Sequence, residues 1–229
     1  MGALGVFTII YASMNALAMQ DLKRMIAYTS VSHMGFVLLG LASLTQAGMH
    51  GALFQMVSHG LIVALLFGIV GVLQCRTQDR IIENYSGLAT QMPHYAIIAM
   101  VSFFAALGLP GFSSFIAELL ILIGVFQASF LPRWMGIVGV IGILLNATYL
   151  VWTIQRVFLG SFFLRCTGWL AALKDLHMKE YILLIPLLLL IFLLGVYPQW
   201  LLNLITDSTN QLVTRIHSIG KANLDTIFP

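Results

Sequence analysis

The sequence predicts an all-α integral membrane protein, and three observations lead to this fold class. Apolar residues make up 60% of the 229 residues, whereas charged residues make up 8%, about a third of their usual share in soluble domains. The apolar residues gather in runs near the length that crosses a bilayer, about 20 residues per helix. The 11 basic and 8 acidic side chains fall mostly between these runs. So few charges cannot cover the surface of a soluble protein of 25.2 kDa.

Six apolar stretches qualify as transmembrane helices, with short polar connections between them. We expect these helices over residues 2–19, 25–44, 50–74, 95–128, 134–158 and 181–197. The first stretch has no basic segment before it and no small-residue cleavage site after it. It therefore predicts a span that stays in the protein and not a cleaved signal peptide.

The fourth stretch, residues 95–128, is too long for one straight crossing. Its helix would extend about 50 Å at 1.5 Å per residue, whereas the hydrocarbon core is about 30 Å thick. Pro110 and Gly111 lie in its middle; proline removes a helical hydrogen bond and glycine loosens the backbone. We therefore expect two half-helices with a break near Pro110 at membrane depth. A simple proline kink is the alternative.

The basic residues predict how the chain crosses the membrane. Eight of the eleven lie in, or at the edge of, the first, third and fifth connections: Lys23, Arg24, Arg76, Arg80, Arg156, Arg165, Lys174 and Lys179. Positive residues favour the cytoplasmic or matrix side, so both termini are predicted on the other side. The basic residues form no patch or stripe, which argues against a nucleic-acid partner.

Four segments follow from this layout. We expect a five-helix unit over residues 1–160, a polar inner loop over 161–180 and a final transmembrane helix over 181–199. Residues 200–229 form a tail whose apolar side chains recur at roughly helical spacing, which is typical of an amphipathic helix at a membrane surface.

Three ionisable residues lie near the middle of predicted spans: His33, His59 and Glu118. Each costs about 2.5–3.5 kcal/mol to insert, so each needs a reason. A carboxylate and imidazoles at one depth, joined by water, can transfer protons. A single histidine can instead be a hydrogen-bonding group between helices. Three ionisable groups at one depth favour proton transfer.

Other polar residues in or beside the spans allow two interpretations. Lys23 lies at the mouth of the second span, where it is either a proton-transfer group or an orientation anchor that extends to the interface. Asn146, Thr148 and Tyr149 in the fifth span either line a wet path or pack ordinarily. No glycine-rich phosphate loop, cysteine cluster or HExxH motif is present, so no bound cofactor, metal or redox centre is expected in this chain.

Segments around these residues resemble one known family, the antiporter-like subunits of respiratory complex I. The strongest match covers residues 21–36 (DLKRMIAYTSVSHMGF). Similar segments are residues 58–60 (SHG), 109–119 (LPGFSSFIAEL), 155–160 (QRVFLG) and 195–198 (GVYP). The resemblance extends over residues 1–200 and is strongest to NADH–quinone oxidoreductase subunit 4, called subunit M in bacteria; the sister subunit 5 has a lysine where this chain has Glu118.

The resemblance implies a fold of fourteen transmembrane helices with two inverted five-helix repeats, each with a broken helix. This chain then corresponds to helices nine to fourteen, which are the second inverted repeat and the final helix. It implies that His33 and His59 are relay groups and that Glu118 is the terminal proton donor beside the broken helix. Lys23 matches a lysine of the family at the mouth of its helix.

The resemblance also implies a proton-translocating membrane-arm subunit of NADH:quinone oxidoreductase, in the bacterial or mitochondrial inner membrane. NADH, FMN, iron–sulfur clusters and quinone would belong to partner subunits. Neighbouring antiporter-like subunits would be partners, and a separate polypeptide or an upstream segment would supply helices one to eight. Two alternatives stay open: a subunit of a related cation/proton antiporter or membrane-bound hydrogenase, and a structural half-subunit that conducts no protons.

Overall fold

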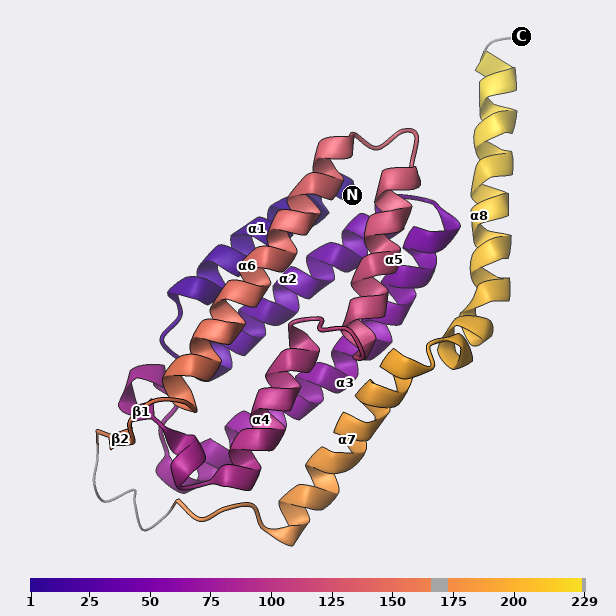
Figure 1. Ribbon diagram of the computed structural model, residues 1–229. Helices are drawn as coiled ribbons and strands as arrows, with labels where there is room; N and C mark the ends of the chain where they lie inside the picture. The colour runs from indigo at the N-terminus through magenta and orange to yellow at the C-terminus, as the bar shows by residue number, and fades with distance from the viewer. Residues whose placement is uncertain (166–172, 228–229) are drawn as a thin grey trace.

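The computed structural model describes residues 1–165 and 173–227 and shows an elongated bundle of helices (Figure 1). The helices are α1 (Gly2–Ala18), α2 (Leu22–Ala42), α3 (Gln46–Thr77), α4 (Pro93–Ala106), α5 (Ser113–Gln127), α6 (Arg133–Val157), α7 (Met178–Val196) and α8 (Gln199–Ile227). Each expected span coincides with one helix except residues 95–128, which form α4 and α5. Residues 166–172, within the expected loop 161–180, lie outside the described part of the chain.

The described helices have the character of a membrane protein. Four of them, α2, α3, α6 and α7, are long and apolar enough to cross a bilayer. The apolar helices α1, α4 and α5 are shorter, with 17, 14 and 15 residues. Large apolar side chains are exposed along the outer faces, for example Leu4 and Phe7 on α1 and Ile137 and Leu144 on α6. Apolar residues that cover both the inside and the outside of a bundle indicate lipid as the surrounding solvent.

Side-chain caps determine where α2 and α3 begin. The Asp21 carboxylate accepts hydrogen bonds from the backbone N–H groups of Lys23 and Arg24, at 2.8 and 3.2 Å. The Thr45 hydroxyl accepts one from the N–H of Gly48 at 3.2 Å. Such caps satisfy the first N–H groups of a helix, which have no partner within it.

Glycines allow the helices to pack with their backbones in contact. A Cβ atom added to Gly5 of α1 would lie 2.8 Å from the carbonyl oxygen of Gly35 of α2. A Cβ atom at Gly124 of α5 would lie 2.2 Å from the nitrogen of Gly48 of α3. Only small residues permit such an approach between helices. These contacts hold α2 and α5 against their neighbours, and both helices carry candidate site residues.

The connection between α4 and α5 contains Pro110 and two glycines in left-handed conformation. Gly108 has a φ of +75° and Gly111 a φ of +101°, which only glycine adopts without strain. The final helix α7 packs directly on this connection, since a Cβ atom at Gly195 would lie 2.3 Å from the carbonyl oxygen of Gly111. The connection is therefore an ordered part of the bundle.

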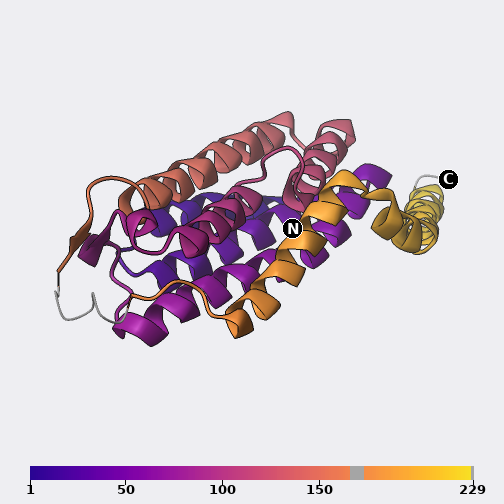
Figure 2. The same cartoon turned by 60° about the horizontal axis from the view of Figure 1, so that its bottom comes forward.

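One end of the bundle, called the sheet end here, carries the short elements that join the helices. They are the 3-10 helices η1 (Ile82–Asn84) and η2 (Leu88–Thr90) and the antiparallel strands β1 (Tyr85–Ser86) and β2 (Phe163–Leu164). The strands pair Tyr85 with Leu164 and Ser86 with Phe163. At the opposite end of the molecule from the strands lies α8 (Figures 1 and 2), which packs against α3.

Candidate functional site

The structure brings three of the four candidate residues together inside the bundle. His33 on α2, His59 on α3 and Glu118 on α5 are 2%, 7% and 5% exposed. The ring centroids of the two histidines lie 5.0 Å apart. His33 Nδ1 lies 3.4 Å from Glu118 Oε1. We call these three residues the central cluster.

Glu118 is contacted by the first turn of its own helix and by the connection before that helix. Ser114, four residues earlier and therefore one helical turn away, donates a hydrogen bond from its hydroxyl to Glu118 Oε1 at 3.3 Å. Gly108 in the α4–α5 connection faces the same carboxylate, and a Cβ atom there would lie 3.0 Å from Oε2. A larger residue at position 108 would press on the carboxylate. The interruption between α4 and α5 thus forms one wall of the central cluster.

A neutral side chain completes the surroundings of His33. The Gln55 amide nitrogen donates a hydrogen bond to His33 Nδ1 at 3.0 Å. The other amide atom, Gln55 Oε1, is buried without a hydrogen-bond partner among the described residues. Sequence reasoning did not single out Gln55; its position one helical turn before His59 was the available signal. His33 therefore has one neutral and one acidic neighbour at the same ring nitrogen.

In the part of the chain that the structure describes, the Glu118 carboxylate has no arginine or lysine as an ion-pair partner. Within residues 1–165 and 173–227, its ion-pair partner is His33, whereas the other described pairs involve arginine or an exposed histidine. A buried carboxylate without a fixed cation can change its protonation state more readily than one locked to arginine. The central cluster is therefore suited to accept and release a proton.

A second buried polar group lies between α1, α2 and α6. The hydroxyls of Ser13, Ser32 and Tyr149 all donate to Asn146 Oδ1, at 2.9, 3.1 and 3.2 Å. Asn146 Nδ2 is buried and has no hydrogen-bond partner in the described chain. Of the fifth-span candidates, Asn146 and Tyr149 are thus buried and bonded together, whereas Thr148 is exposed and bonds to its own helix.

Lys23 is not part of the central cluster. It is exposed at the first turn of α2, and ten residues separate it from His33, about 15 Å along a helix. Lys23 lines a small pocket of about 230 Å³ together with Phe67, Val70, Gly71 and Gln74 of α3. Lys23 therefore lies at the N-terminal end of α2, at the sheet end of the bundle.

The described residues contain no group of three or more histidine, cysteine, aspartate or glutamate side chains that could hold a metal ion. Cys75 is an exposed free thiol. Cys166 falls in the part of the loop that lies outside the described residues. The donor set of the central cluster, two imidazoles and one carboxylate with hydroxyl and amide neighbours, supports proton exchange among its own atoms.

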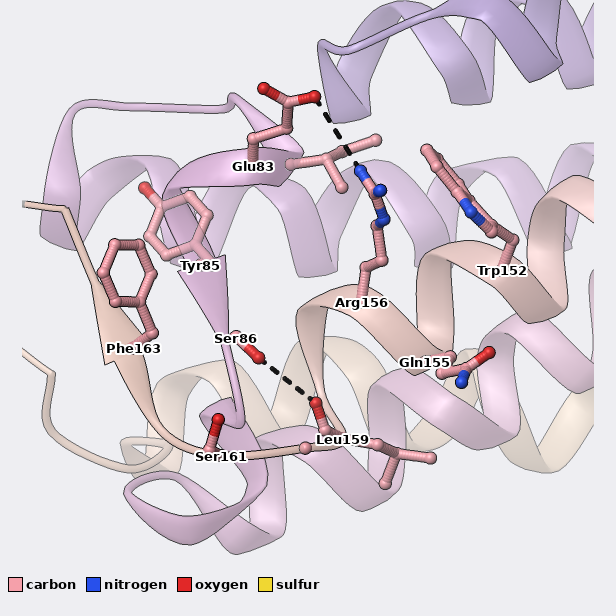
Figure 3. A pocket seen from close by; sticks show the side chains of 11 residues that line it. Glu83, Tyr85, Ser86, Trp152, Gln155, Arg156, Leu159, Ser161 and Phe163 are labelled. Carbon is pink, nitrogen blue, oxygen red and sulfur yellow. Dashed lines mark hydrogen bonds and ion pairs between the residues drawn. The ribbon is translucent and has the colours of Figure 1, made fainter.

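A separate cavity of about 660 Å³ opens at the sheet end, between the end of α6 and the two strands (Figure 3). It is lined by Ile82, Glu83, Tyr85, Ser86, Trp152, Gln155, Arg156, Leu159, Gly160, Ser161 and Phe163. None of the central-cluster residues lines it. It is called the sheet-end pocket below.

The sequence is similar to a known bacterial subunit over most of its length. It is 40% identical over 215 residues to NADH-quinone oxidoreductase subunit M of Rhodobacter capsulatus, which covers 94% of this chain and 41% of that protein. The chain thus spans less than half the length of the curated relatives it matches.

Two solved structures share the fold. A chain of respiratory complex I from Thermus thermophilus with bound NADH superimposes with a TM-score of 0.80 at 30% identity, over 92% of this chain and 44% of that one. A chain of the Mrp complex from Dietzia sp. superimposes with a TM-score of 0.82 at 20% identity, over 93% and 46%. The second likeness, at this identity, shows the fold alone.

A family model for the transmembrane region of NADH:quinone oxidoreductase and Mrp antiporter subunits matches residues 1–146. This match includes all of α1 to α5 and with them His33, His59 and Glu118. It covers well over half of the chain. The chain therefore belongs to the NADH:quinone oxidoreductase/Mrp antiporter transmembrane family.

Proposed function

We propose that this chain is a proton-translocating membrane-arm subunit of NADH:quinone oxidoreductase, or complex I, in which electron transfer from NADH to quinone drives proton pumping. The observation that carries the proposal is the buried contact between His33 and Glu118, with no arginine or lysine paired to that carboxylate in the described chain. The family match and the relative named as subunit M support the same assignment.

In this proposal the bundle crosses the membrane six times. The spans are α1, α2, α3, α6 and α7, with α4 and α5 together as one broken span whose Pro110 connection lies at membrane depth. The sheet end, which carries most of the basic loop residues, faces the cytoplasm or matrix. Both ends of the chain then lie on the far side. The membrane is an energy-transducing one, the bacterial inner or the mitochondrial inner membrane.

The proposed proton step uses the two neighbours of His33 Nδ1. When Glu118 holds the proton, the Gln55 N–H donates to an unprotonated Nδ1, as the 3.0 Å contact describes. When the proton moves to Nδ1, this nitrogen becomes a donor, and its acceptor is Glu118 Oε1. The two atoms are 3.4 Å apart in the structure, and we expect this distance to shorten once both side chains are charged. The Gln55 N–H would then face the N–H of His33 Nδ1, which is unfavourable. A 180° rotation of the Gln55 amide would instead turn its unpartnered Oε1 towards His33 as an acceptor.

His59 extends the same path. Its ring centroid lies 5.0 Å from that of His33, and we propose that a water molecule joins the two rings through their nitrogens. We propose His33 and His59 as relay groups and Glu118 as the group that releases the proton outward. Lys23, about 15 Å from His33 along α2, is proposed as a loading group at the mouth of that helix and exchanges protons with His33 only through intervening water.

The proposal requires partners. Other membrane-arm subunits, including neighbouring antiporter-like subunits, would flank this chain in the bilayer. NADH, FMN, iron–sulfur clusters and quinone would be bound by other subunits. Helices one to eight of the family fold would come from a separate polypeptide or an upstream segment, since this chain covers 41% of its relative from Rhodobacter capsulatus.

A second candidate is a subunit of a related cation/proton antiporter or of a membrane-bound hydrogenase. The TM-score of 0.82 with a chain of the Mrp complex gives this candidate its support. The partners of the purified assembly separate the two. Subunits that bind NADH and iron–sulfur clusters indicate complex I, whereas their absence together with cation-antiporter subunits indicates the second candidate.

The decisive experiment replaces Glu118 by glutamine in the intact assembly. Glu118→Gln keeps the size of the side chain and removes the proton-carrying group. We expect NADH-driven acidification of the far side of membrane vesicles to fall more than about tenfold, with coupled quinone reduction reduced as well. Asp207→Asn on the exposed face of α8 makes the same chemical change outside the cluster and should pump normally. An assembled Glu118→Gln complex that pumps at full strength would identify this chain as a non-conducting structural subunit.

A further inference from the structure

The sheet-end pocket has no part in the proton step proposed above, yet its walls come from two separate segments of the chain, residues 82–86 and 152–163. Glu83 lies on η1, Tyr85 and Phe163 lie on the two paired strands, and Trp152 and Arg156 lie on the last turns of α6. In Figure 3 the Arg156 side chain extends from α6 towards Glu83, and Trp152 lies beside it. Segments far apart in the sequence thus build one cavity of about 660 Å³, a size typical of small-ligand sites.

The pocket carries one positive and one negative charge side by side. Arg156 Nη1 lies 3.8 Å from Glu83 Oε1, and the two side chains are 47% and 54% exposed. At that distance the pair is an ion pair without a direct hydrogen bond. The guanidinium also lies 4.3 Å from the centre of the Trp152 ring, which orients it without using its N–H donors. Both charged groups therefore keep hydrogen-bonding capacity toward a ligand.

The pocket also lies where an apolar helix face ends. Exposed large apolar residues of α6 fall on one helix face: Ile137, Val140, Ile141, Leu144 and, two turns further on, Val151. The pocket residues Trp152, Gln155 and Arg156 come directly after them. Tryptophan and arginine at the end of an apolar span are typical of the level of lipid head groups. A molecule with an apolar chain along α6 would have its polar end at the pocket.

We propose that the sheet-end pocket binds the head group of a zwitterionic phospholipid with a primary ammonium, of the phosphatidylethanolamine class. The phosphate contacts Arg156, with Gln155 and Ser161 as further donors, and the ammonium contacts Glu83. An acyl chain lies along the exposed face of α6. A purely anionic head group would satisfy Arg156 but would bring its charge next to the Glu83 carboxylate, which is unfavourable. The opposite charges on the wall thus match a head group that has both.

The test uses the full membrane assembly reconstituted in nanodiscs with equal amounts of phosphatidylethanolamine, phosphatidylcholine and phosphatidylglycerol. Mild detergent then removes loose lipid, and native mass spectrometry counts the lipid that stays. We expect phosphatidylethanolamine to be retained about threefold over the other two, because its ammonium donates hydrogen bonds to a carboxylate. Equal retention of all three, or preference for phosphatidylglycerol, would overturn the proposal.

Two variants separate a ligand site from a purely structural ion pair. Arg156→Gln should lower the retention of every phospholipid at this site about fivefold. Glu83→Gln should instead remove the preference for phosphatidylethanolamine while phosphatidylglycerol retention stays or rises. Both variants break the same ion pair, so a structural role alone would change them in parallel, and that result would contradict the proposal. Arg133→Gln, at the opposite end of α6 and also exposed, is the matched control and should retain lipid as the unchanged chain does.

A third measurement identifies what covers the pocket. A photo-crosslinking amino acid in place of Leu159, which is 46% exposed on the pocket wall, should label phospholipid in the native membrane. A crosslink to another polypeptide would overturn the proposal and identify a subunit interface. Addition of inorganic phosphate should leave the retained lipid unchanged; its displacement would show that the pocket recognises free phosphate only.

Discussion

Carboxylates in the middle of the bundle and at its sheet end have different kinds of partner. At the sheet end the Glu180 carboxylate accepts a 2.7 Å hydrogen bond from Arg76. In the middle, Glu118 has only an imidazole and a hydroxyl as described polar partners, His33 and Ser114. A carboxylate held by arginine stays charged, because the cation stabilises the ionised form. The same residue type therefore anchors the fold at one end and, as we propose, carries a proton in the other region.

The sheet end is a set of such anchors that link the connections to the helices. The described pairs there are Arg76 with Glu180, Arg80 with Asp21, Arg156 with Glu83 and His94 with Asp175. Each joins segments that are far apart in the sequence or at opposite ends of a helix. The described carboxylates thus differ in their partner: three at the sheet end lie against arginine and one against an exposed histidine, whereas Glu118 lies against a buried histidine.

The largest effect expected on the anchor side is that of Arg76→Met. The Arg76 side chain is 9% exposed, and Glu180 is 24% exposed, so the change leaves a largely buried carboxylate without its cation. We expect a loss of about 2 kcal/mol of stability, measured by unfolding in detergent. Arg80→Met, whose pair with Asp21 is 3.5 Å long and 37% exposed at the arginine, should cost well under about 1 kcal/mol. Equal losses in both variants would break the distinction between buried and exposed anchors.

Gln55→Leu should give the next largest effect, on transport and not on folding. Without the Gln55 amide, His33 Nδ1 keeps Glu118 as its only described partner, so the proton is held between those two residues. We expect proton pumping to fall about fivefold while quantity and unfolding of the assembly stay near normal. The control is Gln127→Leu, the same change at the exposed end of α5. Unchanged pumping in Gln55→Leu would remove the amide from the proposed step.

Asp175 offers a pH test of an anchor outside the membrane. Burial alone would raise the pKa of this carboxyl, but hydrogen bonds from the backbone N–H groups of Leu176, His94 and Tyr95 and from the His94 ring lower its pKa below the ordinary value of 3.8. A lowered pKa in the folded state means that the charged carboxylate stabilises the fold at neutral pH. This contribution is lost as the pH falls below about 3.8 towards the lower folded-state pKa.

Asp175→Asn should therefore destabilise the protein by about 1 kcal/mol at pH 7, because hydrogen bonds to a charged acceptor contribute more than those to a neutral amide. The difference from the unchanged chain should shrink as the pH falls below 4. Thermal unfolding in detergent at several pH values measures it. A difference that is constant down to pH 3 would show that the Asp175 charge does not contribute.

The smallest effect is expected for Lys23→Gln. Because Lys23 is exposed and about 15 Å from His33 along the helix, water can replace it in loading the path. We expect pumping to fall no more than about twofold. Arg24→Gln on the neighbouring exposed position should have no effect. If Lys23→Gln lost as much proton pumping as Glu118→Gln, a residue at the sheet end would be essential for proton transfer. That result would contradict the distinction drawn here between the sheet end and the middle of the bundle.

Much of the fold was predictable because the helices α1 to α7 fall on apolar runs of the sequence. The interruption near Pro110 was predictable as well, since a helix of that length with proline in its middle exceeds the bilayer. The two strands were not predicted: with two residues each, they leave no alternating pattern. They form because the connections of two distant helix pairs meet at the same end of the bundle.

The sequence predicts that the candidate site residues lie at a similar depth in the membrane, but it does not predict which side chains they contact. His33, His59 and Glu118 each lie near the middle of a span, so antiparallel and parallel helices alike bring them to a similar level. Which neighbours they meet depends on how each helix is rotated about its axis. Gln55 is neutral, so it lacks the high cost of membrane insertion that marks the ionisable residues in the sequence. Lys23 matched a family position, yet its place at the start of α2 keeps it away from the central cluster.

The contact between Gly195 of α7 and the backbone at Gly111 has a mechanical consequence. No side chain lies between the two backbones to absorb a displacement, so any movement of the α4–α5 connection pushes directly on α7. The other end of that helix is tethered to α3 through Arg76 and Glu180. A rearrangement beside the Glu118 carboxylate would thus reach α7 at its C-terminal end, where the packing of α7 on α3 and the ion pair at its other end would oppose a shift of the whole helix.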